Sequence, residues 1–255
     1  MSEILKLLIE QVYKEYPMKD GAFETLRDVS MAIRKGEFIS IIGPSGSGKS
    51  TLFKLISGLE VPTSGKILLD GDPVVRGNVG YMPQKDHLLP WRTVLDNVIL
   101  GLEVKGIPKR EARQKAIPYL KLFGLESFEN EFPSSLSGGM KQRAALLRTI
   151  LLEKDVLLLD EPFGALDEIT RLQMQNWLLS IWEKLNHTIL FVTHSIDEAI
   201  FLSDRIYVFS PRPATVKHVV EIPLPRPRKP VMMTDETFIQ LKKELLKQLS
   251  DISQE

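Results

Sequence analysis

Gly-Pro-Ser-Gly-Ser-Gly-Lys-Ser-Thr, residues 43–51, is the stretch of sequence that decides the fold. It matches the phosphate-binding pattern G-x-x-x-x-G-K-[ST]. The apolar run 38–42 before it predicts a buried strand, and the pattern of 52–57 after it predicts a helix. Glycines let successive backbone N–H groups point at an anion, and the helix adds the positive end of its dipole. We therefore expect residues 43–51, here named the phosphate loop, to bind the phosphates of a nucleotide.

The side chains of the phosphate loop add to what its backbone offers. We expect Lys49 to reach the β- and γ-phosphates, and the Ser50 hydroxyl to bind Mg²⁺. The residues assigned to the phosphate site are Gly43, Pro44, Ser45, Gly46, Ser47, Gly48, Lys49, Ser50 and Thr51.

Composition limits the classes of protein to consider. A chain of 255 residues has room for one large α/β domain with an inserted subdomain. Cysteine is absent, which excludes disulfides, thiol catalysis and cysteine-based zinc sites. Lys+Arg and Asp+Glu are equal at 33 each, so the chain lacks the broad positive charge of a nucleic-acid binder, and we expect no nucleic-acid partner. No apolar run reaches the length of a membrane span, and no signal peptide is evident at the N-terminus. The absence of cysteine fits the cytosol without fixing the compartment.

A buried strand at 156–160 ends in two acids, Asp160 and Glu161. A carboxylate at the tip of a strand beside a phosphate loop holds Mg²⁺ or its waters, which is the role expected of Asp160. Glu161 follows on the other side of the strand, and we expect it to activate a water for attack on the γ-phosphate.

Two more polar residues follow short apolar runs. Gln84 lies just past the strand 79–82, and His194 follows the strand 188–193. Ligand-binding residues of open α/β sheets sit beyond the carboxyl ends of the strands. We therefore expect His194 to contact the γ-phosphate. Gln84 could touch Mg²⁺ and orient a water, although a glutamine at such a position, taken alone, is more often a surface residue.

A second potential anion site lies far along the chain, where Ser137, Gly138 and Gly139 open a helix expected to run to about residue 152. Ser137 suits the N-cap, and the two glycines leave backbone N–H groups bare at a positive helix end. One chain has little need of two such sites for one nucleotide. The arrangement makes sense if this site faces the nucleotide of another subunit.

Three segments have less decisive patterns. Residues 4 to about 33 predict a small antiparallel sheet, with Tyr16 on a polar turn, either stacking on an adenine ring or at the surface. Leu88, Leu89 and Trp91 flank a proline and fit either the core or an exposed patch for a partner. Residues from about 96 to 128 are helical in pattern and predict an insertion in the α/β domain.

The end of the chain predicts three more elements. Residues 206–209 read as the final strand, and the Pro- and Arg-rich stretch 211–230 as an extended segment. Residues 234–254 predict an amphipathic helix that packs back on the domain, with binding to a membrane surface as the second interpretation.

These residues together resemble the ATP-binding subunit of ABC transporters, over nearly the whole chain. The phosphate loop matches the Walker A loop, Gln84 the Q-loop, residues 136–143 the signature, 156–160 with Glu161 the Walker B strand, and His194 the switch histidine. The signature usually reads LSGGQ, whereas Met140 stands at the glutamine position here. Leu-Leu-Pro-Trp at 88–91 and the LSGGMKQR form of the signature look like the nitrate/sulfonate/taurine importer branch, which includes importers of pyrimidine precursors.

The resemblance implies a P-loop α/β ATPase with a mainly parallel core sheet, an N-terminal antiparallel β subdomain and an inserted helical subdomain at about 88–150. It implies an ATPase domain at 1–230 and a C-terminal helix at 231–255. ATP and Mg²⁺ would be the cofactors, with Mg²⁺ held by Ser50 and Gln84 and with Asp160 behind them. The adenine-stacking aromatic falls best on Tyr16, with Phe23 as a substitute, and the D-loop on 164–167.

The resemblance also implies the partners and the location. Two subunits would pair head to tail around two ATP molecules, each ATP touching the phosphate loop of one and Ser137, Gly138 and Gly139 of the other, with Asp167 nearby. Membrane-spanning permease subunits would dock near Leu88, Leu89 and Trp91, at the cytoplasmic face of the membrane, and a solute-binding protein would complete the system.

Other function classes fit less well. A soluble ABC ATPase of DNA repair or translation usually carries a long coiled-coil insertion, a zinc module or two tandem cassettes, and none of these fits the sequence. An ATP-gated module without turnover disagrees with the presence of Glu161 and His194, and a small-molecule kinase disagrees with the signature.

Overall fold

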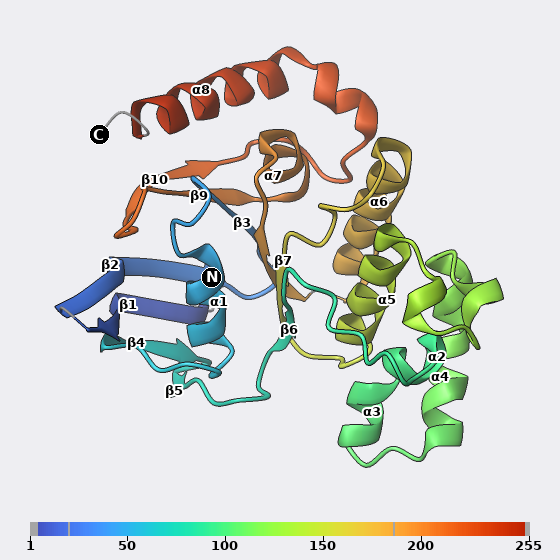
Figure 1. Cartoon of the computed structure of the whole chain (residues 1–255). Helices are drawn as coiled ribbons and strands as arrows, with labels where there is room; N and C mark the ends of the chain where they lie inside the picture. Colours follow the sequence, from blue (N-terminus) through green and yellow to red (C-terminus); the bar gives the residue numbers. More distant parts are fainter. Residues whose placement is uncertain (1–4, 20, 186, 253–255) are drawn as a thin grey trace.

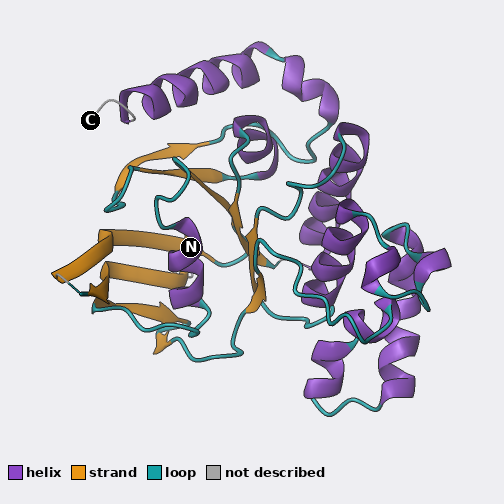
Figure 2. Ribbon diagram, in the orientation of Figure 1, coloured by secondary structure: helices purple, strands orange, loops and turns teal. Residues whose placement is uncertain are grey.

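The computed structural model describes residues 5–19, 21–185 and 187–252 and contains two β-sheets flanked by helices (Figures 1 and 2). The larger sheet has the strand order β10-β9-β3-β8-β7-β6. Its members are β3 (Phe38–Ile42), β6 (Gly80–Met82), β7 (Val156–Asp160), β8 (Thr188–Val192), β9 (Arg205–Phe209) and β10 (Val216–Glu221). All neighbours pair in parallel except β10, which is antiparallel to β9. The predicted mainly parallel core sheet is therefore confirmed.

The strands β3, β7 and β8 are buried along their whole length, as expected of parallel strands covered on both faces. They are adjacent in the sheet and run in the same direction, so the chain leaves all three at one edge. The phosphate loop and Glu161 follow β3 and β7 directly, Asp160 is the last residue of β7, and His194 lies two residues after β8. The sheet order thus gathers segments that are more than 100 residues apart in sequence.

The smaller sheet is antiparallel, as predicted, with the order β2-β1-β4-β5. Its strands are β1 (Leu5–Met18), β2 (Gly21–Arg34), β4 (Ser64–Leu69) and β5 (Asp72–Pro73). Helix α1 (Lys49–Ile56) shares one hydrophobic core with β1, β2 and one face of the larger sheet. The helix that begins in the phosphate loop is therefore fixed by both sheets.

The other face of the larger sheet is covered by helices (Figure 2). Helices α5 (Gly138–Ile150) and α6 (Glu168–Leu185) lie next to the sheet, and α2 (Val94–Val98), α3 (Leu100–Val104) and α4 (Lys109–Leu122) pack together beyond α5. Two 3₁₀ turns lie at Glu126–Phe128 and Pro133–Ser135. The segment predicted as helical from about 96 to 128 is thus broken into pieces, one break falling at Gly106, whose φ of 83° leaves the helical region.

The C-terminal part contains α7 (Ile196–Leu202), a 3₁₀ turn at Pro230–Thr234 and α8 (Glu236–Ile252). Helix α8 packs against α7, as predicted for a helix that folds back on the domain, and buries Phe238, Leu241 and Leu245. The prediction that 206–209 is the final strand was wrong, because β10 follows it and lies within the stretch read only as extended. No helix among the described residues combines the length and the apolar content needed to cross a bilayer.

Candidate functional site

The phosphate loop joins the end of β3 to the start of α1, and its close packing requires glycine at one position in particular. Gly48 has a φ of 103° and precedes the first helical residue. A Cβ atom there would lie 2.9 Å from a methyl carbon of Leu26 and 3.0 Å from one of Thr25. The left-handed conformation and the contact with β2 both exclude a larger residue.

Lys49 lies across the inside of the phosphate loop. Its Nζ donates to the backbone carbonyls of Gly43 (2.9 Å) and Pro44 (2.8 Å) and to the Ser47 hydroxyl (3.2 Å). Burial lowers the pKa of Lys49, while the nearby carboxylates of Glu161 and Asp160 act in the opposite direction. The ammonium group is thus held by neutral acceptors, which an incoming phosphate can replace with stronger, charge-assisted hydrogen bonds.

A cavity of about 340 Å³, here named the phosphate cavity, opens in front of the loop. The residues that line it are Ser45, Gly46, Ser47, Gly48, Lys49, Ser50, Thr51, Gln84, Glu161, Val192 and Arg212. The structure therefore brings most of the phosphate loop together with Gln84 and Glu161. It adds Arg212, which the sequence did not suggest.

Asp160 ends strand β7 next to the phosphate loop. It is only 2% exposed, and the Ser50 hydroxyl forms a hydrogen bond with its carboxyl group. Burial raises the pKa of Asp160, the Ser50 hydrogen bond opposes the rise, and the Glu161 charge reinforces it. A hydroxyl and a carboxylate side by side are a donor set suited to a hard cation such as Mg²⁺, which prefers oxygen ligands.

Glu161 is the residue around which the other polar side chains gather. Its φ of 50° turns the chain out of β7, and its backbone N–H donates to the Val192 carbonyl (2.9 Å). The Gln84 side-chain amide donates to Glu161 Oε2 at 3.1 Å. His194 Nδ1 lies 3.6 Å from the same oxygen, and its side chain is 68% exposed. Gln84, Glu161 and His194, three of the residues predicted to be catalytic, thus meet at one carboxylate oxygen.

The second predicted anion site is elsewhere in the chain. Ser137 caps α5 by accepting from the Met140 N–H (3.3 Å), as predicted, but Ser137, Gly138 and Gly139 do not line the phosphate cavity. Asp167 does not line it either; its carboxylate caps α6 by accepting from the Thr170 N–H (2.9 Å).

Gln142, in the first turns of α5, joins this helix to Glu161 and to the loop that precedes Asp167. Its side-chain amide donates to the Glu161 carbonyl (3.3 Å) and accepts from the Ala165 N–H (2.8 Å). The start of α5 therefore lies against the loop that follows β7. Gln142 was not predicted as a site residue, because a glutamine within a helix carries no sequence signal for a contact with a loop about 20 residues away.

Tyr16 lies in strand β1, so its prediction on a polar turn was wrong. The ladder with β2 continues past it, pairing Tyr16 with Phe23. The Tyr16 hydroxyl donates to the Glu60 carboxylate, and Lys14 Nζ lies 4.8 Å from the centre of its ring. Burial, followed by the Glu60 hydrogen bond, raises the pKa of Tyr16 to about 12. Thr51, the last residue of the phosphate loop, acts on the Tyr16 hydroxyl in the opposite direction and lowers its pKa, and adenine stacking stays a prediction.

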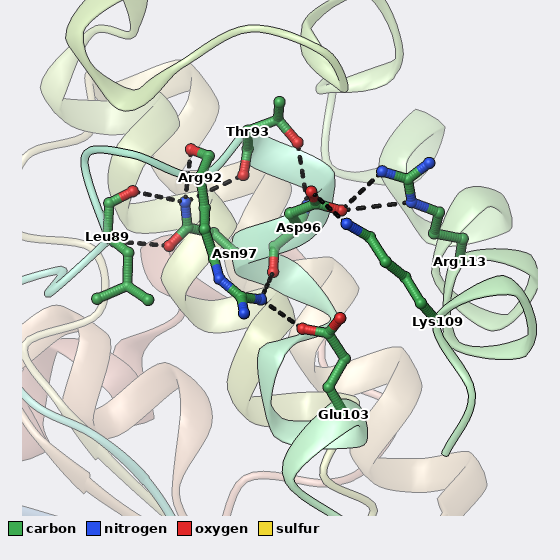
Figure 3. Close-up of polar contacts among 8 residues, drawn as sticks. All are labelled: Leu89, Arg92, Thr93, Asp96, Asn97, Glu103, Lys109 and Arg113. Atoms are coloured by element: carbon green, nitrogen blue, oxygen red, sulfur yellow. Dashed lines mark hydrogen bonds and ion pairs between the residues drawn. The ribbon is translucent and has the colours of Figure 1, made fainter. Parts of the chain in front are cut away.

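The sequence left open whether the apolar residues of segment 88–91 lie in the core or form an exposed patch, and the structure shows one of each. Leu88 is 8% exposed and belongs to the core, so its assignment to a docking surface was wrong. Trp91 is 72% exposed. Asn97 fixes the backbone on either side of Trp91, because its side chain accepts from the Leu89 N–H (2.7 Å) and donates toward the carbonyls of Leu89, Arg92 and Thr93 at 3.0–3.1 Å (Figure 3).

Ion pairs hold the outer side of the same turn. Arg92 bonds Glu103, and Asp96 accepts from Lys109 (2.8 Å) and Arg113 (2.8 Å), which ties α2 to α4 (Figure 3). The turn that carries Trp91 is thus fixed to the helices on both sides.

Asn97→Ala is expected to lower the free energy of unfolding by about 2–4 kcal/mol, because Asn97 is fully buried and its loss leaves several backbone groups without partners. Thermal unfolding followed by circular dichroism measures this. Asn176→Ala on α6, where the side chain makes a single hydrogen bond to the Leu172 carbonyl, is the matched control and should cost less than half as much. Equal losses in the two variants would contradict the role given to Asn97.

Comparison with known proteins agrees with this arrangement. A family model described as ABC transporter matches residues 26–164. The formylaminopyrimidine import ATP-binding protein ThiZ of Halalkalibacterium halodurans is 44% identical over 95% of this chain and 94% of its own length. The nitrate import ATP-binding protein NrtD of Synechococcus elongatus is 43% identical over 92% and 88%. The aliphatic sulfonates import ATP-binding protein SsuB of Bacillus cereus is 40% identical over 94% of both chains.

Two solved structures of one cassette, MJ0796, are similar in fold. Its dimeric structure has a TM-score of 0.79 at 32% identity, covering 85% of this chain and 98% of that one. A dimeric post-hydrolysis state bound to ADP and Pi gives 0.78 at the same identity and coverage. Family model, relatives and fold agree with the site geometry, and the chain belongs to the ABC transporter family as an ATP-binding subunit.

Proposed function

We propose that this chain binds and hydrolyses ATP as the energising subunit of a membrane importer for a small solute. The observation that carries the proposal is the meeting of Gln84 and His194 at the Glu161 carboxylate, at the mouth of the phosphate cavity. The relatives named for import of sulfonates, nitrate and formylaminopyrimidine support transport rather than a soluble role. Specificity for the solute lies in other subunits of such a system.

The residues present fit a bound Mg²⁺. The Ser50 hydroxyl acts on the Asp160 carboxyl group and opposes the rise of its pKa, and Gln84 lines the same cavity as Ser50 with a neutral amide oxygen. Ser50 and Gln84 would hold the ion, with Asp160 behind them. Mg²⁺ supplies positive charge that offsets the charge of the phosphate oxygens.

The chain's own residues then divide the remaining work. The Glu161 carboxylate accepts a hydrogen bond from a water and polarises it for in-line attack on the γ-phosphate. Lys49 exchanges its carbonyl partners for phosphate oxygens, and His194 donates to the γ-phosphate from the other side. Gln84, which donates to Glu161 at 3.1 Å, orients the carboxylate and the water.

A second copy of the chain completes the site. Ser137, Gly138 and Gly139 form an anion site at the start of α5 that does not line the phosphate cavity of their own chain. In the proposed head-to-tail homodimer, they contact the triphosphate held by the partner's phosphate loop. The dimeric cassettes with similar folds support this arrangement.

The proposal is tested with the purified chain by phosphate release in Mg-ATP, and then with the chain reconstituted with its permease and solute-binding protein. We expect basal turnover that saturates with ATP, and stimulation by loaded solute-binding protein. ATP turnover that no permease alters would favour a soluble, non-transport ATPase, and absence of any turnover would contradict hydrolysis.

Trp91→Ala is expected to lower permease-stimulated ATP turnover and solute uptake about tenfold, while basal ATPase activity of the isolated subunit is unchanged. An exposed tryptophan on a turn fixed by Asn97 is a typical anchor for a partner at the cytoplasmic face of the membrane. Uptake into vesicles measures coupling, with Val231→Ala as control because Val231 is similarly exposed at 67% but lies in the C-terminal segment. Unchanged stimulation would contradict docking at Trp91.

A further inference from the structure

Arg212 lies at the boundary of two adjoining cavities. It lines the phosphate cavity, and it also lines a second cavity of about 630 Å³ beside it. The two cavities share Ser45, Gly46 and Arg212, and Phe23 contributes to the wall of the second. An arginine side chain therefore borders the space in front of the phosphate loop, and neither the family motifs nor the proposed mechanism uses it.

The loop that carries Arg212 is fixed at both ends. After β9 ends, the Ser210 hydroxyl bonds the carbonyl of Pro211 (2.9 Å) and accepts from the Thr215 N–H (2.9 Å). Ala214 then joins β2 through two backbone hydrogen bonds of 2.9 Å, one donated to the Thr25 carbonyl and one received from Arg27. These bonds hold the Arg212 Cα in place next to the phosphate loop.

The guanidinium group is oriented from two sides. It stacks on the Phe23 ring, 4.6 Å from the ring centre, and one of its Nη atoms donates to the Gly46 carbonyl. Glu24 also lines the second cavity, and its carboxylate pairs with Arg27 rather than with Arg212. No carboxylate within the described ranges forms an ion pair with Arg212, so its charge and its remaining N–H donors stay available to a ligand.

We propose that Arg212 is a phosphate-binding residue, which donates from its guanidinium to phosphate oxygens of the nucleotide in the phosphate cavity. Arginine presents a planar set of donors suited to phosphate, and its charge is not lost at any physiological pH. Stacking on Phe23 and the bond to Gly46 orient the side chain before the ligand arrives, so little side-chain freedom is lost on binding. This inference rests on the proposed function, since it assigns a further contact to the same nucleotide site.

The test measures Mg-ATP and Mg-ADP affinity by titration calorimetry in the Glu161→Gln background, where ATP is not consumed. Dilute protein keeps the chain monomeric, so that the measured affinity for the nucleotide is that of one phosphate cavity without a contribution from dimer formation. We expect Arg212→Ala to weaken ATP binding about tenfold and to flatten its dependence on salt. Arg212→Gln keeps a donor for Gly46 but removes the charge, and it should show a similar loss. Arg110→Ala, an exposed arginine on α4, is the control and should leave the affinity unchanged.

The experiment distinguishes a failure of this inference from a failure of the proposed function. If the parent protein binds ATP and both Arg212 variants bind it within about twofold of the parent, the inference is overturned. If the parent itself does not bind ATP, the proposed function is the one that is wrong. Should Arg212→Ala fail to fold, as judged by its thermal unfolding, Arg212→Gln decides the question. A Phe23→Leu variant that lowers ATP affinity less than Arg212→Ala does would further support a charge contact over simple wall packing.

Discussion

Glu161→Gln is expected to slow phosphate release from Mg-ATP by about 10²–10⁴-fold while leaving ATP affinity within a few-fold of the wild-type value. The amide cannot accept a proton from the attacking water. In the proposed site, the contacts that bind phosphate come from the phosphate loop with its Lys49 and from the partner, and none of them needs the Glu161 charge. ATP therefore binds and persists, and the ATP-loaded homodimer should accumulate.

Gel filtration with and without Mg-ATP measures the dimer, and a phosphate-release assay measures turnover. Glu153→Gln is the matched control, because Glu153 is also an acid with a φ of 50° and does not line the phosphate cavity. The control should hydrolyse ATP at the wild-type rate. Substantial turnover by Glu161→Gln, or an ATP-dependent dimer that is no more abundant than in wild type, would contradict the assignment of Glu161 as the water-activating group.

The parts of this site that could be predicted are those set by short-range pattern and by the direction of parallel strands. Apolar runs followed directly by Gly43, Asp160 and His194 predict strands whose last residues share one edge, and the order β3-β8-β7 brings them together. The glycines of the phosphate loop are needed for local backbone geometry, which is why that motif can be recognised without any tertiary information.

The parts that could not be predicted depend on contacts between distant segments. Leu88 and Trp91 are both large and apolar, and contacts with the rest of the fold decide that Leu88 lies in the core while Trp91 is exposed to solvent. Strand β10 lies in a Pro- and Arg-rich stretch and forms because β9 offers a free edge. Arg212 reaches the phosphate cavity from a loop more than 160 residues beyond it in sequence. None of these depends on a local motif.

Asp160→Asn is expected to lower Mg-dependent ATP hydrolysis more than about 100-fold, because a neutral amide supports the Mg²⁺ site less well than a carboxylate. The same change should make the nucleotide-free protein more stable. Asp160 is buried and its pKa is raised chiefly by that burial, so its ionisation favours the unfolded chain. The asparagine can still accept the Ser50 hydrogen bond, and it removes the cost of the buried charge. We expect the melting temperature to rise by about 2–4 °C near neutral pH, equivalent to roughly 1 kcal/mol.

The pH dependence gives the sign of the effect. For an acid whose folded-state pKa lies above its unfolded value, the cost is absent below the unfolded pKa, grows as pH rises through the folded pKa, and is constant above it. The melting-temperature gain of Asp160→Asn should therefore be small near about pH 4 and largest toward about pH 8. Asp155→Asn is the control with the opposite sign, because its hydrogen bond with Lys6 lowers the pKa of Asp155 and makes the carboxylate stabilising at neutral pH.

A lower melting temperature for Asp160→Asn than for wild type at neutral pH would contradict this account. It would mean that the negative charge of Asp160 is already stabilised by its surroundings in the nucleotide-free protein. If the gain is observed, the site holds a buried carboxylate beside a buried Lys49 whose own partners are neutral carbonyls. The charges of both groups then destabilise the nucleotide-free protein, and they become stabilising once Mg²⁺ and phosphate are bound. Saturating Mg-ATP should accordingly raise the melting temperature of wild type more than that of Asp160→Asn, because only the wild-type carboxylate gains a cation on binding.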